Sequence, residues 1–202
     1  MTEWLGRIDL SPINGRDRVP NCDFDMTNTI PHFDAFGLAL REIRAEDAHS
    51  WFDYLRIPEV VRLNSWNVSA VEDMQAIIEK MSANAVNRPL RFALAATATD
   101  RLVGTIGFHS LSIENASAEI AYDLAPEYWR QGIMSAACEP LIRWGFDALQ
   151  LNRIQGCAMV GNHASARILE KNGFRLEGVL REFRVARGRP SDFRVYSRLR
   201  SD

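Results

Sequence analysis

A lone glycine, Gly132, stands between the bulky residues 129–131 and a long apolar pattern of helical period that begins at Ile133. The first turn of a helix carries backbone N–H groups without intrahelical partners and the positive end of the helix dipole, so it attracts anions such as phosphate. A glycine at this point lets the backbone approach a ligand without a Cβ in the way. The junction therefore indicates a phosphate site, with a plain turn into the helix as the alternative.

Other familiar binding motifs do not occur in the sequence. No GxGxxG follows a strand-like run and no GxxxxGK[ST] is present, which excludes a dinucleotide-binding fold and a P-loop. The cysteines Cys22, Cys138 and Cys157 show no CxxC spacing, and the four histidines form no HxxxH pair. We therefore expect neither a disulfide framework nor a metal site.

Length and composition describe one ordinary globular domain. The 202 residues are 47% apolar and 25% charged, which is enough for a single core. No stretch approaches 18 consecutive apolar residues, and Glu3 and Asp9 interrupt the start, where a signal peptide would carry a basic and then an apolar run. We expect a cytoplasmic protein without a membrane partner.

The net charge of −2 argues against nucleic acid as a main partner. This charge is unevenly distributed, because residues 173–202 carry eight arginines against four acidic residues, a net of +4, and residues 1–172 carry −6. A solvated basic face explains this excess, and a site for a polyanion is the alternative.

The elements that would position the Gly132 junction follow from periodicity. Residues 1–36 are punctuated by glycine, proline, asparagine and aspartate without a sustained period, which predicts an irregular extension in front of one domain, residues 37–202. In the first half of this domain, the three successive strands at 90–98, 102–111 and 116–124 predict an antiparallel meander. The expected strands cover 36–43, 90–98, 102–111 and 116–124, and the expected helices cover 45–56 and 69–81.

Local signals mark the ends of both expected helices. Pro58 ends the first helix, whose buried face carries Ala48, Trp51, Phe52 and Leu55. At the start of the second, Ser69 can cap the free amides and Glu72 follows three residues later, which completes a capping-box pattern.

The second half of the domain alternates helix and strand. Pro140 falls inside the helix that begins at Ile133, where it predicts a kink. The last strand alternates apolar and charged residues, the pattern of a strand with one wet face. The expected order is a helix from Ile133, a strand at 153–160, a helix at 162–172 and strands at 174–186 and 192–200. This order of elements predicts an α/β (α+β) fold with a mixed central sheet flanked by helices. The antiparallel meander comes first in the chain, and a β-α-β-α-β-β arrangement follows it.

Two stretches carry a family resemblance: "YWRQGIMSAACEPLIRWGF" and, shortly after it, "NRIQGCAMVGNHASARILEKNGFRLEG". Together they resemble the paired signature of the GCN5-related N-acetyltransferases (GNAT superfamily), in the RimJ/RimL-like branch of ribosomal-protein N-terminal acetyltransferases. The resemblance covers about residues 38–200 and implies the GNAT fold. The second stretch matches the branch motif N-x-x-S-x-x-x-L-E-K-x-G-F-x-x-E-G at Asn162, Ser165, Leu169, Glu170, Lys171, Gly173, Phe174, Glu177 and Gly178.

The resemblance implies acetyl-CoA as cosubstrate, with its diphosphate held by backbone amides of the loop around Gly132. Against the branch pattern W-G-x-G-x-[AM]-[ST], Trp129, Met134 and Ser135 fit. The departures are Arg130, where glycine is usual, and Ala136, where glutamate is usual. The arginine could add a charge-assisted contact to phosphate. The implied coenzyme A contacts are Tyr122, Leu124, Arg130, Gln131, Gly132, Ile133, Met134, Ser135 and Asn162.

The implied reaction is direct attack of an amine on the thioester. Glu119 is the expected base, because the resemblance places its strand along the acetyl group, and Glu114 is the reserve candidate; a wet-face glutamate is the alternative. Ser165 is the expected donor to the leaving thiolate, with a hydroxyl bonded to backbone as the alternative. Asn162 can also cap its helix. Backbone N–H groups near Tyr122 would polarise the carbonyl.

The acceptor is expected between the two N-terminal helices and the last strands, where Asn64 and Trp66 are candidate lining residues. We expect an N-acetyltransferase whose preferred acceptor is the α-amine of a protein or peptide N-terminus. A small-molecule amine (polyamine, amino sugar or amino acid) is the close alternative, and a non-catalytic acyl-CoA-binding regulatory protein is a further one. A homodimer is left open.

Overall fold

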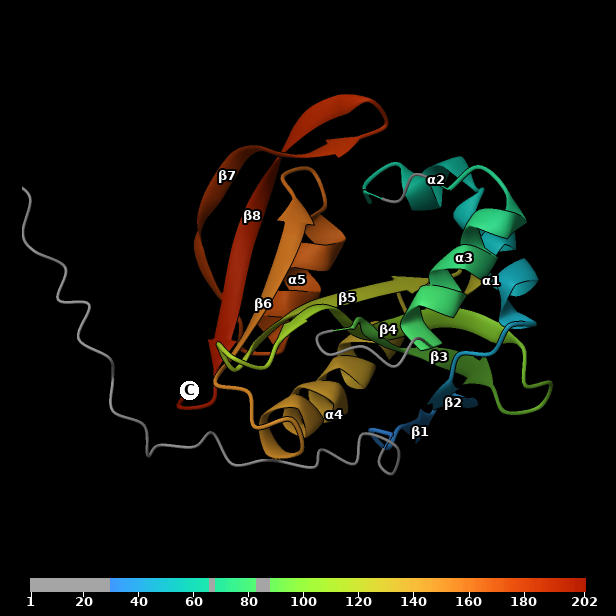
Figure 1. The fold of residues 1–202 in the computed structure, drawn as a ribbon, viewed down its shortest axis with the longest axis horizontal. Coiled ribbons are helices and arrows are strands. Elements are labelled where there is room, and N and C mark those ends of the chain that lie inside the picture. Colours follow the sequence, from blue (N-terminus) through green and yellow to red (C-terminus); the bar gives the residue numbers. More distant parts are fainter. Residues whose placement is uncertain (1–29, 66–67, 83–87) are drawn as a thin grey trace, which may run out of the picture.

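An eight-stranded sheet forms the centre of the molecule, in the order β1-β2-β3-β4-β5-β6-β8-β7 (Figure 1). The structure, a computed structural model, describes residues 30–65, 68–82 and 88–202. The strands are β1 Asp34–Ala35, β2 Leu38–Glu42, β3 Leu90–Ala96, β4 Leu102–Ser112, β5 Ser117–Leu124, β6 Arg153–Met159, β7 Arg175–Ala186 and β8 Arg189–Leu199. The helices are α1 Asp47–Leu55, α2 Pro58–Val61, α3 Val71–Ser82, α4 Ile133–Asp147 and α5 His163–Lys171, and a 3-10 turn covers Pro126–Tyr128.

The sheet is mixed, as the sequence predicted. Strands β3 to β5 form the expected antiparallel meander, and β2 pairs with β3 in antiparallel orientation. Strand β6 then pairs with β5 in parallel, which requires a crossover, and α4 supplies it. Strands β6, β8 and β7 continue the sheet in antiparallel pairs.

Strands β5 and β6 stay together over a short distance only. Their parallel pairing covers three residues and stops at Glu119 and Gln155. Beyond this point the two strands diverge, as Figure 1 shows, so the middle of the sheet opens between the C-terminal half of β5 and that of β6.

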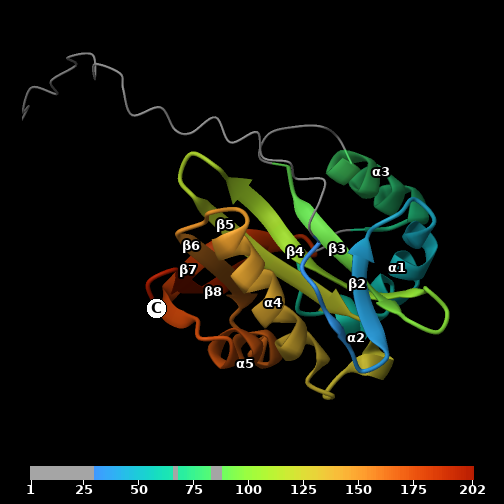
Figure 2. The same ribbon diagram turned by 90° about the horizontal axis from the view of Figure 1, so that it is seen from below.

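Helices cover both faces of the sheet. Figures 1 and 2 show α4 and α5 on one face and α1 and α3 on the other. Strand β3 is buried on both faces, because Phe92 and Leu94 join the core under α4 whereas Ala93 joins the core under α1 and α3. This explains why its sequence is apolar without alternation.

The expected helices are confirmed, with two local differences. In α1, Ala48, Trp51 and Leu55 are buried as predicted, whereas Phe52 is only half-buried against the same core. Pro58 was expected only to end that helix, but it is also the first residue of α2. The capping box at α3 was assigned to the wrong carboxylate: Asp73, not Glu72, accepts the backbone N–H groups of Ser69 (2.7 Å) and Ala70 (3.0 Å), because the helix begins later than predicted.

Helix α4 begins at Ile133, as predicted, and continues to Asp147 with Pro140 inside it. The kink expected at Pro140 stays a prediction. The single wet face expected for β8 was wrong, since Tyr196 and Ser197 are both buried although they lie on opposite faces. The reason is that β8 lies between β6 and β7, and the Tyr196 hydroxyl reaches Glu170 of α5 (3.3 Å).

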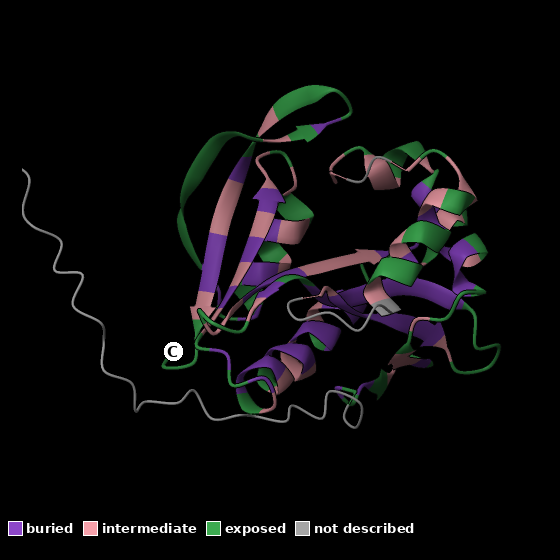
Figure 3. Cartoon of the chain, viewed as in Figure 1, coloured by how far each residue is buried: buried purple, intermediate pink, exposed green. Residues whose placement is uncertain are grey.

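Part of the predicted extension takes part in the fold. Residues 1–29 lie outside the described residues, but Phe33 is buried in the core and β1 pairs with β2. At the other edge of the sheet, β7 is exposed along most of its length (Figure 3). Within the described ranges, no helix is both long enough and apolar enough to cross a membrane.

Candidate active site

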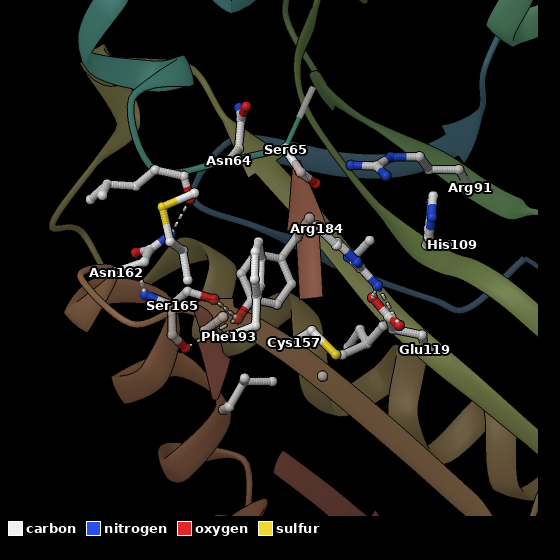
Figure 4. Close-up of a pocket in the computed structure, with 18 of the residues that line it drawn as sticks. Asn64, Ser65, Arg91, His109, Glu119, Cys157, Asn162, Ser165, Arg184 and Phe193 are labelled. Carbon is white, nitrogen blue, oxygen red and sulfur yellow. Dashed lines mark hydrogen bonds and ion pairs between the residues drawn. The ribbon is translucent and has the colours of Figure 1, made fainter. Parts of the chain in front are cut away.

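A pocket of about 260 Å³ lies where β5 and β6 diverge. Figure 4 shows Asn162 and Ser165 on one side of it and Arg91, His109, Glu119 and Arg184 on the other. The lining residues are Leu63, Asn64, Ser65, Val68, Ile77, Arg91, His109, Glu119, Ile120, Ala121, Tyr122, Gly156, Cys157, Ala158, Met159, Asn162, Ser165, Leu169, Arg184 and Phe193.

The Gly132 junction has the backbone of an anion site. Gly132 is the N-cap of α4 with a left-handed backbone (φ 80°, ψ −1°), and no side chain caps the helix. No hydrogen bond within the described residues engages the amides of residues 133–135, whereas Ala136 already donates to the carbonyl of Gly132 (3.0 Å). A Cβ on Gly132 would meet no atom within 4 Å, so its φ alone demands glycine.

Side chains around this junction hold the loop rather than face a ligand. The Trp129 indole N–H donates to the carbonyl of Leu124 at the end of β5 (2.7 Å), and the Gln131 side-chain amide donates to the carbonyl of Glu127 (2.9 Å). The side chains of Ile133 and Met134 are buried in the core. At these positions, the predicted contacts with coenzyme A therefore have to come from the backbone and not from the side chains.

Arg130 is exposed and also has a left-handed backbone, with φ 61°. This conformation is strained for any residue with a Cβ, and it explains why glycine is usual at this position of the branch pattern. The arginine thus brings a positive charge beside the helix N-terminus at a cost in backbone strain.

Asn162, Ser165 and Tyr122 form a connected group inside the pocket. The side-chain oxygen of Asn162 accepts the backbone N–H of Ser165 (3.1 Å), which confirms Asn162 as the N-cap of α5. Its side-chain amide donates to the carbonyl of Leu63 (3.1 Å) and so ties α5 to the segment after α2. The Tyr122 hydroxyl oxygen lies 3.0 Å from the Ser165 hydroxyl oxygen. Burial raises the pKa of Tyr122 well above its usual range, so the phenol keeps its proton.

Glu119 lies in the pocket, but it is not a free carboxylate. One Arg184 nitrogen donates to both of its oxygens (2.7 and 2.9 Å), and the Gln155 side chain is 3.4 Å away. Arg184 in turn lies over the rings of Phe183 and Phe193, 4.9 and 5.5 Å from their centroids. Glu114, the reserve candidate, is exposed in the turn between β4 and β5 and does not line the pocket.

A buried network fixes the strand beside Tyr122. Asp123 forms an ion pair with Arg91 and accepts hydrogen bonds from the hydroxyls of Tyr54 and Thr105. Arg91 also donates to Thr105 (2.7 Å) and lies over the ring of Trp51. Arg91 lines the pocket, so the charge that it brings there is balanced by Asp123.

Asn64 lines the pocket as expected, and its carbonyl accepts a hydrogen bond from Arg187 in the turn between β7 and β8. Trp66 lies outside the described residues. Cys157 also lines the pocket, where burial raises its pKa to about 12, so it is a protonated thiol and a weak nucleophile.

The residues missed from the sequence are Arg184 and His109. Arg184 on β7 pairs with Glu119, which lies 65 residues away in the sequence, and no local sequence pattern predicts an ion pair over such a separation. His109 lies at a break of alternation in β4, where two polar residues in succession, His109 and Ser110, follow the apolar Phe108. This break in the sequence pattern was the signal that could have identified His109.

Comparisons with known proteins identify the relatives of this chain. The profile of the family described as "Acetyltransferase (GNAT) domain" matches residues 38–175. The uncharacterized N-acetyltransferase YoaA of Bacillus subtilis (strain 168) is 38% identical over 162 residues, which cover 79% of this chain and 92% of YoaA. The ribosomal-protein-serine acetyltransferase of Escherichia coli (strain K12) is 33% identical over 100 residues, which cover 50% of this chain and 56% of that protein.

Solved structures share the fold. The crystal structure of a GNAT-family acetyltransferase from Bacillus anthracis superposes with a TM-score of 0.72 at 25% identity, covering 85% of this chain and 99% of that one. Other proteins with this fold, at 22% and 19% identity, were solved with acetyl-CoA and with coenzyme A.

Proposed function

Because the chain belongs to the GNAT acetyltransferase family, we propose that it moves the acetyl group of acetyl-CoA to the α-amine of a protein or peptide N-terminus. One observation carries this proposal: Ser165 and Glu119 lie on opposite sides of a single pocket, at the point where β5 and β6 diverge (Figure 4). A thioester between them would have a hydroxyl at its sulfur and a carboxylate beside the attacking amine.

The N-terminus of α4 fits the diphosphate of acetyl-CoA. The amides of residues 133–135 are unengaged within the described chain, no side chain caps them, and Gly132 adds no Cβ. Arg130 would add a positive charge beside them. The thioester of acetyl-CoA supplies an activated acetyl group, and the residues of the pocket supply orientation and proton transfer.

In this proposal the Ser165 hydroxyl donates its proton to the leaving thiolate, and Asn162 holds the first turn of α5 in place for it. Glu119 acts on the amine side, where its charge favours the positive charge that develops on nitrogen during attack. Backbone N–H groups of β5 beside Tyr122, beyond the last residue that pairs with β6, polarise the acetyl carbonyl. No protein nucleophile is needed, which agrees with the high pKa of Cys157.

The charges of the pocket favour an α-amine over a polyamine. Glu119 is the one carboxylate among the described lining residues, and it already forms an ion pair with Arg184. A polyamine carries several ammonium groups and would meet Arg91 and Arg184 here without a spare carboxylate. An α-amine has a pKa of about 7.7–8, so its neutral form at pH 7 costs only about 1 kcal/mol, whereas a lysine amine costs about 4–5 kcal/mol. The relative from Escherichia coli, a ribosomal-protein-serine acetyltransferase by name, supports the same acceptor class.

An acceptor screen tests the proposal, with release of free thiol from acetyl-CoA as the readout. Peptides with free N-termini should be acetylated, N-terminally blocked copies of the same peptides should not, and polyamines, amino sugars and free amino acids should react more slowly. A faster reaction with any small amine would contradict the proposed acceptor.

The double variant Glu119→Gln with Ser165→Ala tests the assignment of roles. It should retain affinity for acetyl-CoA and lose acetyl transfer. If the double variant matched the wild type with the preferred acceptor, neither residue would take part in the reaction. A wild type that binds acetyl-CoA and acetylates no amine would instead be the non-catalytic acyl-CoA-binding protein. Gel filtration tests the oligomeric state, which the sequence leaves open between a monomer and a homodimer.

A further inference from the structure

His109 is the extra residue of a β-bulge. In the antiparallel pair of β4 and β5, Phe108 is opposite Ile120 and Ser110 is opposite Glu119, so two steps along β4 correspond to one step along β5. A bulge of this kind turns a side chain away from the direction that regular alternation would give it. Here it brings the imidazole of His109 into the pocket next to Glu119, as Figure 4 shows.

The charged groups around His109 are already paired with one another. Glu119 on β5 and Arg184 on β7 form one ion pair, and Arg91 on β3 forms another with Asp123. Within the described residues, no hydrogen bond engages the imidazole of His109. The charged side chains on this side of the pocket are thus engaged in ion pairs, whereas the imidazole of His109 has a ring nitrogen that can bind a substrate.

His109 is also in the protonation state that a base requires. Burial lowers its pKa from 6.5, and Arg184 and Arg91 lower it further, whereas Glu119 opposes the shift. The imidazole is therefore neutral at pH 7 and can accept a proton. Glu119 remains close enough to stabilise the imidazolium that results.

We propose that His109 accepts the proton of the attacking amine and that Glu119 stabilises the imidazolium so formed. This role rests on the proposed function. The amine nitrogen forms the C–N bond to the acetyl carbon, the C–S bond breaks, and one N–H proton moves to a ring nitrogen of His109. The thiolate takes a proton from Ser165, and the proton on His109 returns through solvent to the serine oxygen. The net change is amine plus thioester to amide plus thiol.

The pH dependence of kcat/KM in the wild type and in His109→Gln tests this role. Both the α-amine, with a pKa of about 8, and His109, with a pKa below 6.5, must lose a proton in the wild type. At pH values below the pKa of His109 the slope of log kcat/KM against pH should therefore approach about 2, and in His109→Gln it should fall to about 1. At pH 7 the variant should be slower by about 100-fold.

Two further measurements separate a chemical role from a structural one. Imidazole added to His109→Ala should restore part of the rate, and the affinity of both variants for acetyl-CoA should equal that of the wild type by calorimetry. His49→Gln is the matched control, since His49 is an exposed histidine on α1 outside the pocket, and its rate and slope should not change.

An active His109→Gln with the wild-type slope would overturn the role of His109 and leave the proposed function intact. Should that variant fail to fold, the wild type alone decides: the lower limb of its pH profile must coincide with the pKa of His109 measured by NMR, and a mismatch overturns the role. A wild type that acetylates no amine would overturn the proposed function, and the role of His109 with it.

Discussion

The hydroxyl oxygens of Tyr122 and Ser165 lie 3.0 Å apart, and the Tyr122 hydroxyl is also 3.2 Å from the backbone carbonyl of Ser165. Because burial keeps the phenol protonated, it can donate either to that carbonyl or to the serine oxygen. In the second arrangement the serine keeps its own proton free to point at a leaving thiolate. Tyr122 is thus placed to orient Ser165, although it lies on a strand and Ser165 on a helix.

Substitution of these two residues should separate donation from orientation. Ser165→Ala removes the donor and should lower kcat by about 100-fold, within the usual range for a positioned acid. Tyr122→Phe removes only one hydrogen-bond partner of the serine and should lower kcat by about fivefold, since such a bond contributes about 1 kcal/mol. Steady-state thiol release with saturating substrates measures both effects. Equal losses in the two variants, or no loss in Ser165→Ala, would contradict these roles.

Gly132→Glu should weaken acetyl-CoA binding. The substitution places a carboxylate beside the free amides of α4 and forces a side chain onto a φ of 80°, so it opposes the phosphate and strains the backbone. We expect at least a tenfold rise in the Kd by calorimetry. Gly37→Glu is the matched control, because Gly37 has a φ of 69°, equally open surroundings and a place in the turn between β1 and β2. An unchanged Kd in Gly132→Glu would exclude the junction as the diphosphate site.

Arg130→Gly should change stability and binding in opposite directions. Glycine relieves the left-handed strain at φ 61° and should raise the free energy of unfolding by about 0.5–1 kcal/mol, after the greater entropy of glycine in the unfolded chain is subtracted. Loss of the charge should raise the KM for acetyl-CoA several-fold. Urea denaturation and steady-state kinetics measure the two effects. Arg130→Ala keeps the strain and loses the charge, so it should share the rise in KM without the gain in stability.

Periodicity and helix caps predicted those features of the fold that depend on residues close together in the sequence. The start of α4 at Ile133 and the cap at Asn162 were correct, because each is fixed by interactions within a few residues. The meander was also correct, because short turns join its successive strands. Even the error at α3, where Asp73 replaces Glu72, is a shift of one position within the same motif.

The contacts that shape the acceptor side could not be predicted in this way. Arg184 pairs with Glu119 from the edge strand β7, and that contact depends on the order of strands in the sheet, which places β8 and then β7 beyond β6. The same order buries both faces of β8 and made the expected wet face wrong. The direction of His109 depends on a one-residue bulge that binary patterning does not specify.

The edge of the sheet carries a pH-dependent contact that can be tested apart from activity. Glu177 on β7 accepts two hydrogen bonds from Arg153 on β6 (2.7 and 2.5 Å) and one from Ser197 on β8 (2.6 Å). The hydrogen bonds from Arg153 and then from Ser197 lower the pKa of Glu177 from 4.5 to about 2. Three strands are therefore joined by one ionised carboxylate.

Because the native pKa lies below the unfolded value, this contact stabilises the fold fully above pH 4.5 and is lost as the pH falls toward 2. The Glu177 side chain is 42% exposed, so solvent screening leaves a contribution of about 1 kcal/mol. Glu177→Gln should thus be about 1 kcal/mol less stable than the wild type at pH 7, and the difference should shrink toward zero near pH 2. Urea denaturation of both proteins at pH 7, 4.5 and 2.5 measures it. A difference that stayed constant across these pH values would assign the loss to packing, because an amide and a carboxylate differ in titration and hardly in size.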